Sequence, residues 1–277
     1  TEVTNDQFLA FLNDALANPT SGRGAYVYHD LDSGSVYLNA DETGDAGTDA
    51  PSAVLTALLY DASIGRIGFE NQRYVVETGY GRHPVVGVTW YGAIKYCNWL
   101  TLFAGLPEGV RAYDEGPDPA DWHPVTVTTD DWRQRGINAT ERSDLIARTV
   151  GYRLPMDDER TTESPFNEWY KAAAARTAAD PGAPGLFDAL YGFGRDVLTS
   201  ADANYFAGGD TQPDATTPSG FFNGVNKLLD ATTLTVATAN RYGLLDACGN
   251  VAEWTQDFFS PGDPSQRATR GGSAARS

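Results

Sequence analysis

Hydrophobic residues recur at helical spacing in two stretches of the chain, and each stretch begins at a threonine. The first follows Thr4, where Gln7 stands three positions later as in a capping box, and a Pro- and Gly-containing turn ends it before residue 25. The second follows Thr89, a residue type that caps helices. Five of its residues share one apolar face: Trp90, Ala93, Ile94, Cys97 and Leu100. We predict an α-helix in each stretch and expect their aromatic residues to lie in the core.

Elsewhere the pattern is shorter and richer in turns. Alternating runs at 25–28, 36–38, 67–69 and 74–76 predict β-hairpins, and residues 84–88 predict an apolar strand. The acidic cluster at 41–45 is typical of a solvated turn. Three prolines make residues 112–131 an extended insertion or surface loop, residues 130–148 are helical in pieces, and a helix is predicted to start at Ser164-Pro165 and continue through Arg176.

Composition narrows the class of protein. A chain of 277 residues with 41% hydrophobic residues can bury a sizeable core, while 29 Gly and 15 Pro predict many loops. The net charge of −17 disfavours nucleic acid and anionic membranes. It favours cations or basic partners, or it serves only to keep the protein soluble or adapted to a salty habitat. No apolar run is long enough to span a membrane. The two cysteines, Cys97 and Cys248, are too few for a disulfide scaffold and are expected as small buried residues.

Residues 243–254 carry the candidate chemistry. Asp246 and Glu253 flank a Gly249-Asn250 turn, and apolar residues surround the turn on both sides. Ca²⁺ prefers a mixture of carboxylate and carbonyl oxygens, which a kinked loop of this kind can supply. The spacing alone is weak evidence for such a site, and a solvated turn is its default interpretation.

This segment, GLLDACGNVAEW, resembles the G-L-Y-D-M-x-G-N-V-W-E-W signature of the sulfatase-modifying-factor family, which includes the formylglycine-generating enzymes. Five other stretches resemble family motifs in the same order: 1–11, 83–99, 151–155, 167–173 and 270–273. The resemblance implies a C-type-lectin-like α+β fold, rich in loops, with short twisted antiparallel sheets and a few packed helices. It also implies a single domain over residues 1–277 with insertions near 25–79, 112–148 and 156–166.

The resemblance further implies two structural Ca²⁺ sites. In the first, Asp246 and Glu253 are the side-chain ligands, and Gly249 and Val251 donate carbonyls. Ala252 stands where the family usually has tryptophan. In the second, the ligands are the Asn204 side chain, the Tyr205 carbonyl and a downstream aspartate, for which Asp214 and Asp210 are alternatives.

The copper-binding cysteine pair of formylglycine-generating enzymes follows the family's R-G-G-S motif. In this chain Arg270 to Ser273 runs straight into Ala274, and no cysteine follows. We expect that the intact protein carries a further loop between Ser273 and Ala274, and that it extends before Thr1. The three histidines, His29, His83 and His123, are widely separated and are expected as structural residues rather than as the iron ligands of the related sulfoxide synthases.

Three functions follow from these features. The first is a non-catalytic display domain on a calcium-braced scaffold, as in retroelement-diversified variable proteins. It would bind a protein or small-molecule ligand at its C-terminal face through Arg270 and Ser273. The second is a copper-dependent oxidase that converts a sulfatase cysteine to formylglycine, with its cysteines in the further loop. The third is a structural component of an envelope or extracellular assembly. For each of them we expect an extracellular or periplasmic location.

Overall fold

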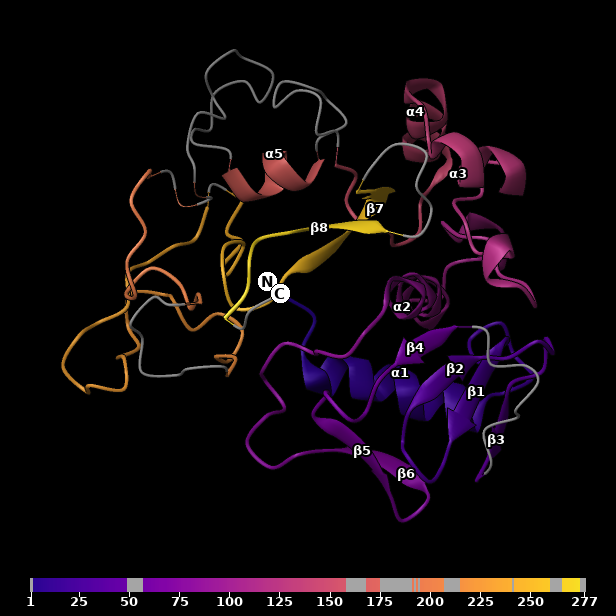
Figure 1. Ribbon diagram of the computed structural model, residues 1–277, viewed down its shortest axis with the longest axis horizontal. Helices are drawn as coiled ribbons and strands as arrows, with labels where there is room; N and C mark the ends of the chain where they lie inside the picture. The colour runs from indigo at the N-terminus through magenta and orange to yellow at the C-terminus, as the bar shows by residue number, and fades with distance from the viewer. Residues whose placement is uncertain are drawn as a thin grey trace.

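The computed structural model describes residues 2–48, 57–157, 168–174, 191, 193, 195–206, 215–240, 242–259 and 266–274. Figure 1 shows the N-terminal helices and sheets at the lower right and the two-stranded β7–β8 sheet near the centre. The loops of residues 195–240 extend to the left. Mixed helices, short sheets and long connections confirm the predicted loop-rich α+β class.

Helix α1 (Asn5–Ala17) starts as the sequence predicts, because Thr4 accepts from the Gln7 amide and the Gln7 side chain accepts from the Thr4 amide. Helix α2 (Trp90–Phe103) is capped by Thr89. Its burial extends well beyond one apolar face, since Lys95 is also completely buried. The Lys95 ammonium is compensated by the Glu115 carboxylate at 2.6 Å, so a charged residue is accommodated on the inner side of the helix.

The largest sheet has the strand order β3-β1-β2-β4. Its strands are β1 (Val27–Asp30), β2 (Val36–Leu38), β3 (Asp45–Gly47) and β4 (Leu58–Tyr60), and β1 pairs antiparallel with β2 but parallel with β3. A separate hairpin joins β5 (Ile67–Glu70) to β6 (Arg73–Val76). These elements confirm the predicted strands, while β3 and β4 were not predicted from the sequence.

Two sequence-based expectations differ from the structure. Residues 84–88 form no continuous strand: Pro84 bridges to Thr4 and Val88 bridges to Tyr60, so the two ends pair with different elements. Residues 112–131 are not simply a surface loop, because the Trp122 side chain is completely buried and donates to the Gly116 carbonyl at 2.8 Å. A short 3-10 helix, η2 (Pro119–Asp121), precedes that tryptophan.

The remaining helices are short. They are η1 (Glu108–Val110), α3 (Thr129–Arg135), α4 (Ala139–Arg148) and α5 (Glu168–Ala174). The predicted helical pieces at 130–148 are therefore confirmed, while the predicted start at Ser164-Pro165 and the insertion at 158–166 lie outside the described residues. No helix in the described ranges is both long and apolar enough to cross a membrane.

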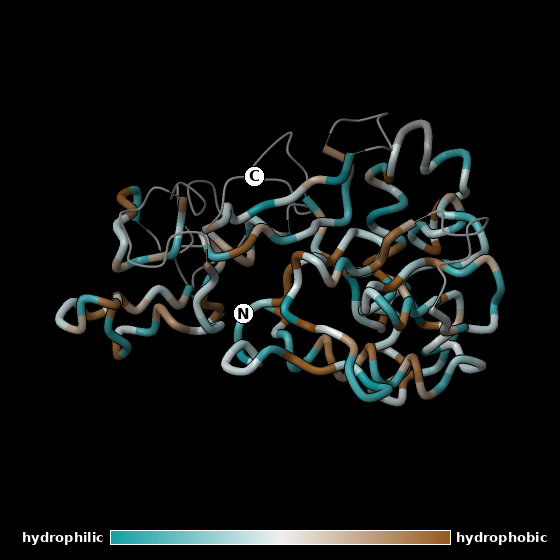
Figure 2. The backbone as a smooth tube through the Cα atoms, turned by 60° about the horizontal axis from the view of Figure 1, so that its bottom comes forward, coloured by the Kyte–Doolittle hydropathy of each residue, from teal (hydrophilic) through white to brown (hydrophobic). Residues whose placement is uncertain are grey.

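Strands β7 (Glu253–Phe258) and β8 (Arg267–Arg270) attach the candidate loop to the core. The Trp254 indole donates to the Val88 carbonyl at 2.9 Å, and the Trp90 indole donates to the Thr255 carbonyl at 3.0 Å. The Arg267 guanidinium lies 3.9 Å from the centre of the Trp90 ring. Figure 2 shows hydrophobic and hydrophilic segments following one another along the described chain.

Candidate functional site

The loop that precedes β7 has an unusual backbone. Asp246, Gly249 and Asn250 all have positive φ, at 60°, 84° and 64°. At Gly249 a side chain is also excluded by space, because a Cβ atom would lie 2.4 Å from the carbonyl oxygen of Asn204. The segment carrying Asn204 is thus held directly against the loop, which brings residues of the two predicted metal sites together.

Asn250 joins the segments that meet here. Its side chain is 2% exposed and its Oδ1 accepts from the Thr217 amide at 2.8 Å. Its Nδ2 donates to Glu2 Oε1 at 2.8 Å and to the Thr217 carbonyl at 3.1 Å. The Asn250 carbonyl accepts from the Ala274 amide at 3.0 Å. One buried residue therefore fixes the start of the chain, through its side chain, and residue 274, through its backbone carbonyl, to the same loop.

The two predicted side-chain ligands of the first metal site are buried and incompletely satisfied. Asp246 is 4% exposed; its Oδ2 accepts from the Gly220 amide, whereas its Oδ1 has no hydrogen-bond partner in the described structure. Glu253 Oε2 is likewise buried without a partner. The carboxylate of Glu253 fills the space beside Gly271, where a Cβ atom would lie 2.0 Å from Oε2. Buried oxygens without donors are the feature that a bound cation would satisfy.

Glu2 adds a third carboxylate to this region. Burial and the negative charge of Asp246 together raise the pKa of Glu2 to about 8. Burial, followed by the charge of Glu2, raises the pKa of Glu253 well above its usual range. Burial also raises the pKa of Asp246. The three carboxyl groups thus disfavour one another's ionisation, and a divalent cation would reverse that effect.

The predicted second site is described in part. The Asn204 side chain donates to the Ala215 carbonyl at 2.8 Å, and its Oδ1 is buried without a partner. Tyr205 follows in the same irregular segment, but Asp210 and Asp214 lie outside the described residues. No three His, Cys, Asp or Glu side chains converge on a metal position in the ranges described. Both predicted sites depend partly on carbonyl oxygens, and they remain predictions.

Arg270 and Ser273, the predicted ligand-binding residues, lie at the end of β8. The Arg270 guanidinium forms an ion pair with Asp157 at 2.6 Å, and the Asp157 amide donates to Asp257 at 2.8 Å. The Ser273 carbonyl accepts from the Phe206 amide at 3.0 Å. Both residues therefore contribute to the junction that holds the loop, and the Arg270 side chain remains 29% exposed.

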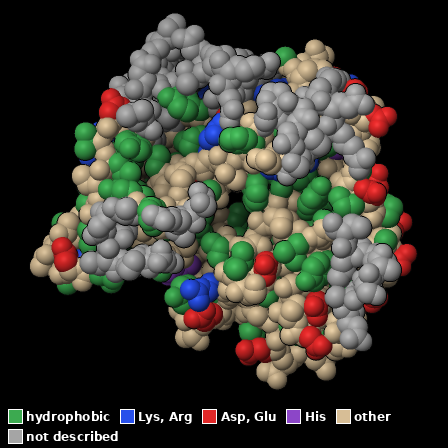
Figure 3. All heavy atoms as spheres, viewed as in Figure 1, with side chains coloured by type: hydrophobic (Ala, Val, Ile, Leu, Met, Phe, Trp, Pro, Cys, Tyr) green, Lys and Arg blue, Asp and Glu red, His purple; other side chains and the backbone are tan. Residues whose placement is uncertain are grey.

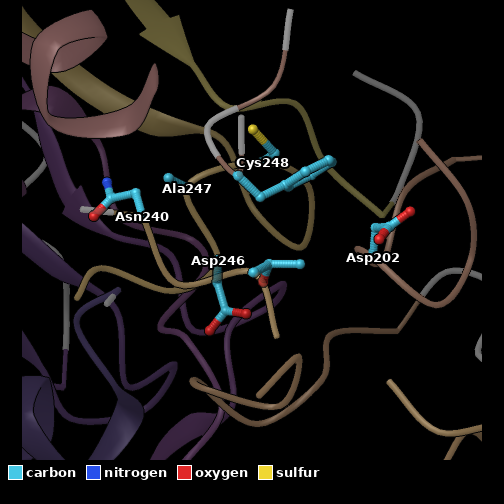
Figure 4. A pocket seen from close by; sticks show the side chains of 7 residues that line it. Asp202, Asn240, Asp246, Ala247 and Cys248 are labelled. Carbon is cyan, nitrogen blue, oxygen red and sulfur yellow. The ribbon is translucent and has the colours of Figure 1, made fainter. Parts of the chain in front are cut away.

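A small pocket with about 220 Å³ of free space, part of it open to solvent, lies beside the loop. Its lining includes Asp202, Asn240, Asp246 and Cys248. Figure 4 shows the Asp246 carboxylate and the Cys248 sulfur pointing in different directions. Cys97 is instead buried in the α2 core, where burial raises its pKa to about 12. The Cys97 and Cys248 side chains thus have separate surroundings.

Sequence reasoning did not identify Glu2, Asn250 or Gly271 as parts of this site. Glu2 and Gly271 lie inside family-like motifs, but neither position carried a signal of its function. Asn250 was interpreted as a turn residue. The Glu2–Asn250 hydrogen bond spans 248 positions, a separation that no local pattern encodes.

This α+β arrangement around a buried polar loop is of the formylglycine-generating-enzyme type, which confirms the predicted fold class. The family model described as sulfatase-modifying factor enzyme 1-like domain matches residues 1–277, and the chain belongs to that family. The structure is similar to the crystal structure of CarF, with a TM-score of 0.52 and 20% identity, over 100% of this chain and 74% of that one. It also matches Treponema denticola variable protein 1, with a TM-score of 0.41 and 23% identity, over 73% of this chain and 64% of that one.

Two curated relatives are much longer than this chain. A stretch of 194 residues, 70% of the chain, is 27% identical to serine/threonine-protein kinase pkn1 of Chlamydia pneumoniae. A stretch of the same length is 26% identical to the pkn1 protein of Chlamydia caviae. The match covers 17% of each relative.

Proposed function

We propose that this chain is a non-catalytic binding domain whose scaffold is braced by Ca²⁺ at the loop of Asp246 and Glu253. The observation that carries the proposal is the pair of buried carboxylate oxygens that receive no hydrogen bond, Asp246 Oδ1 and Glu253 Oε2. Such oxygens are costly unless a donor or a cation compensates them. A Ca²⁺ ion there, completed by the Gly249 and Val251 carbonyls, would connect the loop rigidly to β7.

The arrangement of the thiols favours this proposal over a copper oxidase. A Cu(I) site in that chemistry needs two thiolates close together. The chain has two cysteines, and Cys97 is enclosed in the core while Cys248 lines the pocket beside Asp246. The raised pKa of Cys97 keeps its thiol protonated at neutral pH. The separate surroundings of Cys97 and Cys248 therefore favour the non-catalytic proposal over a copper site formed by these two residues.

The surroundings of the loop support a binding role. Loops on a rigid scaffold are suited to recognition, and the partly exposed Arg270 side chain lies at the end of β8, next to the segment that Asn250 anchors. The pkn1 relatives carry a similar stretch as a minor part of a protein named for kinase activity, which fits an accessory domain. An extracellular or periplasmic location, where calcium is abundant, agrees with a structural Ca²⁺ site.

The experiment measures metal content and oxidase chemistry on the same sample. Protein equilibrated with calcium and copper and then passed through a desalting column is examined by elemental analysis, and oxygen consumption is followed with a cysteine peptide. We expect bound calcium, no stoichiometric copper and no oxygen consumption above that of free copper. Stoichiometric copper together with turnover of the peptide would establish the oxidase. A protein that retains no calcium would refute the proposed Ca²⁺ site.

A further inference from the structure

Residues 221–238 form an irregular hairpin at the left of Figure 1. Asn223 bridges to Ala237 and Lys227 bridges to Leu234. The Leu228 amide donates to the Thr233 carbonyl at 2.9 Å, and the Thr235 amide donates to the Asn226 carbonyl at 2.8 Å. The hairpin is therefore a defined element of the structure.

The hairpin has a polar side chain, Thr235, on its buried side and several aliphatic side chains on its exposed side. The inward Thr235 side chain is 3% exposed and hydrogen-bonds the Asn226 carbonyl, and Asn226 donates to the Phe221 carbonyl. The exposed positions carry Lys227, which bridges to Leu234, and four aliphatic side chains. Their exposed fractions are 76% for Val225, 60% for Leu229, 52% for Leu234 and 36% for Val236. A solvated hairpin normally turns its polar side chains outward, so this aliphatic face is unusual.

The base of the hairpin is fixed to the candidate loop. The Gly220 amide donates to Asp246 Oδ2, and the Val236 amide donates to the Ala201 carbonyl at 2.7 Å. Phe222 is buried at the base, and Thr238 lines the pocket beside Asp246. The aliphatic face is thus presented by a rigid support, and Figure 3 shows hydrophobic side chains exposed on this side of the molecule among few charged ones.

Charge indicates the occupant of this face. Within residues 215–240 the charged residues are Lys227 and Asp230, so the hairpin itself is neutral. The whole chain carries a net charge of −17. A second copy and an anionic membrane would both be repelled, whereas a basic partner would be attracted over a long range. An aliphatic face on an acidic body is complementary to an apolar surface bordered by Lys and Arg.

We propose that the outward face formed by Val225, Leu229, Leu234 and Val236 docks an amphipathic segment of a basic partner protein. The inference rests on the proposed binding function, but it places the contact on a surface separate from Arg270 and Ser273. The apolar side of the partner segment covers the four aliphatic side chains, and its Lys and Arg side chains face the acidic body. Burial of these aliphatic groups supplies affinity, and charge supplies orientation.

The test uses two fluorescent synthetic peptides of the same amphipathic pattern, one of leucine and lysine and one of leucine and glutamate. Binding is measured by fluorescence anisotropy with the full chain, with Val225→Thr/Leu229→Asn, and with a matched control, Ile64→Thr/Val150→Thr, which changes exposed aliphatic residues elsewhere. We expect the leucine–lysine peptide to bind the unaltered chain and the control, and the hairpin variant to bind at least about tenfold more weakly because two apolar contacts are lost. The leucine–glutamate peptide should not bind.

Each other result overturns the inference. Equal binding by the hairpin variant would show attraction to the acidic surface alone. A dimer that the hairpin variant abolishes would identify a second copy as the occupant, and binding to phosphatidylcholine vesicles that the hairpin variant abolishes would identify a lipid surface. Calcium-dependent melting is recorded for the same samples: its loss in all of them refutes the brace at Asp246, whereas its retention without peptide binding refutes only the docking face.

Discussion

Replacing Asp246 by Asn and Glu253 by Gln removes two buried charges while keeping the shape of each side chain. If these groups hold Ca²⁺, calcium at about 100 times its dissociation constant stabilises the folded protein by about 2.7 kcal/mol. A domain somewhat smaller than this chain gains roughly 2–4 °C in melting temperature per kcal/mol. We therefore expect calcium to raise the melting temperature of the unaltered chain by about 5–10 °C and to leave the double variant unchanged.

The same double variant should also differ from the unaltered chain in how its stability depends on pH when EDTA removes calcium. The folded-state pKa values of Glu2, Asp246 and Glu253 are raised above their unfolded values, so the associated stability is present at acidic pH and is lost as pH rises through the folded values. The calcium-free chain should lose stability between about pH 5 and pH 8, the upper limit being the pKa of about 8 for Glu2. The double variant should show a shallower loss because two of the three groups can no longer ionise.

Differential scanning calorimetry in EDTA and in millimolar calcium, repeated across this pH range, measures both signatures. Glu42→Gln/Asp144→Asn is the control, because it removes two exposed carboxylates and should retain the calcium response of the unaltered chain. The reasoning is refuted if the Asp246/Glu253 variant responds to calcium as strongly as the control, or if the unaltered chain does not respond.

Three further predictions concern the core and the junction. Burial lowers the pKa of His29 to about 4, so the stability that this residue contributes is present above about pH 6.5 and is lost as pH falls. His29→Asn should therefore reduce the acid destabilisation of the protein by on the order of 3 kcal/mol. Urea unfolding at pH 7 and pH 4 measures this difference. Gly271→Ala should destabilise the chain and weaken calcium binding in calorimetric titration, because its Cβ would occupy the position of the Glu253 carboxylate; an unchanged affinity would contradict this geometry. Asn250→Gly permits the positive φ but leaves several buried hydrogen-bond partners unsatisfied. We expect the free energy of unfolding, measured in urea, to fall by about 3 kcal/mol or more. A fall below about 1 kcal/mol would show that the side chain is dispensable.

The sequence predicted those features that neighbouring residues determine. The Thr4–Gln7 capping box and the Thr89 cap involve residues three positions apart, and both were located correctly. Residues 112–131 were interpreted as a surface loop from their prolines, yet Trp122 is buried because distant elements cover it. Composition describes a segment's local preference, and burial depends on what folds over it.

The candidate site shows the same division. The loop sequence identified Asp246 and Glu253, but not Glu2 near the start of the chain, whose pKa is raised by Asp246 and whose charge in turn raises the pKa of Glu253. The hairpin at 221–238 has alternating residues, and alternation alone does not reveal which set faces outward. Its aliphatic face became evident once the burial of Thr235 was known. In both cases the missing information was long-range contact.

Because Glu2 and Ala274 are both hydrogen-bonded to Asn250, the first and last described residues are neighbours in space. Such a fold can be inserted into a surface loop of a larger polypeptide while separating the host's flanking residues very little. Joining the two ends with a short linker and opening the chain elsewhere should likewise preserve its architecture. In such a permuted chain Asn250 would still hydrogen-bond the same segments, although their order along the chain would differ.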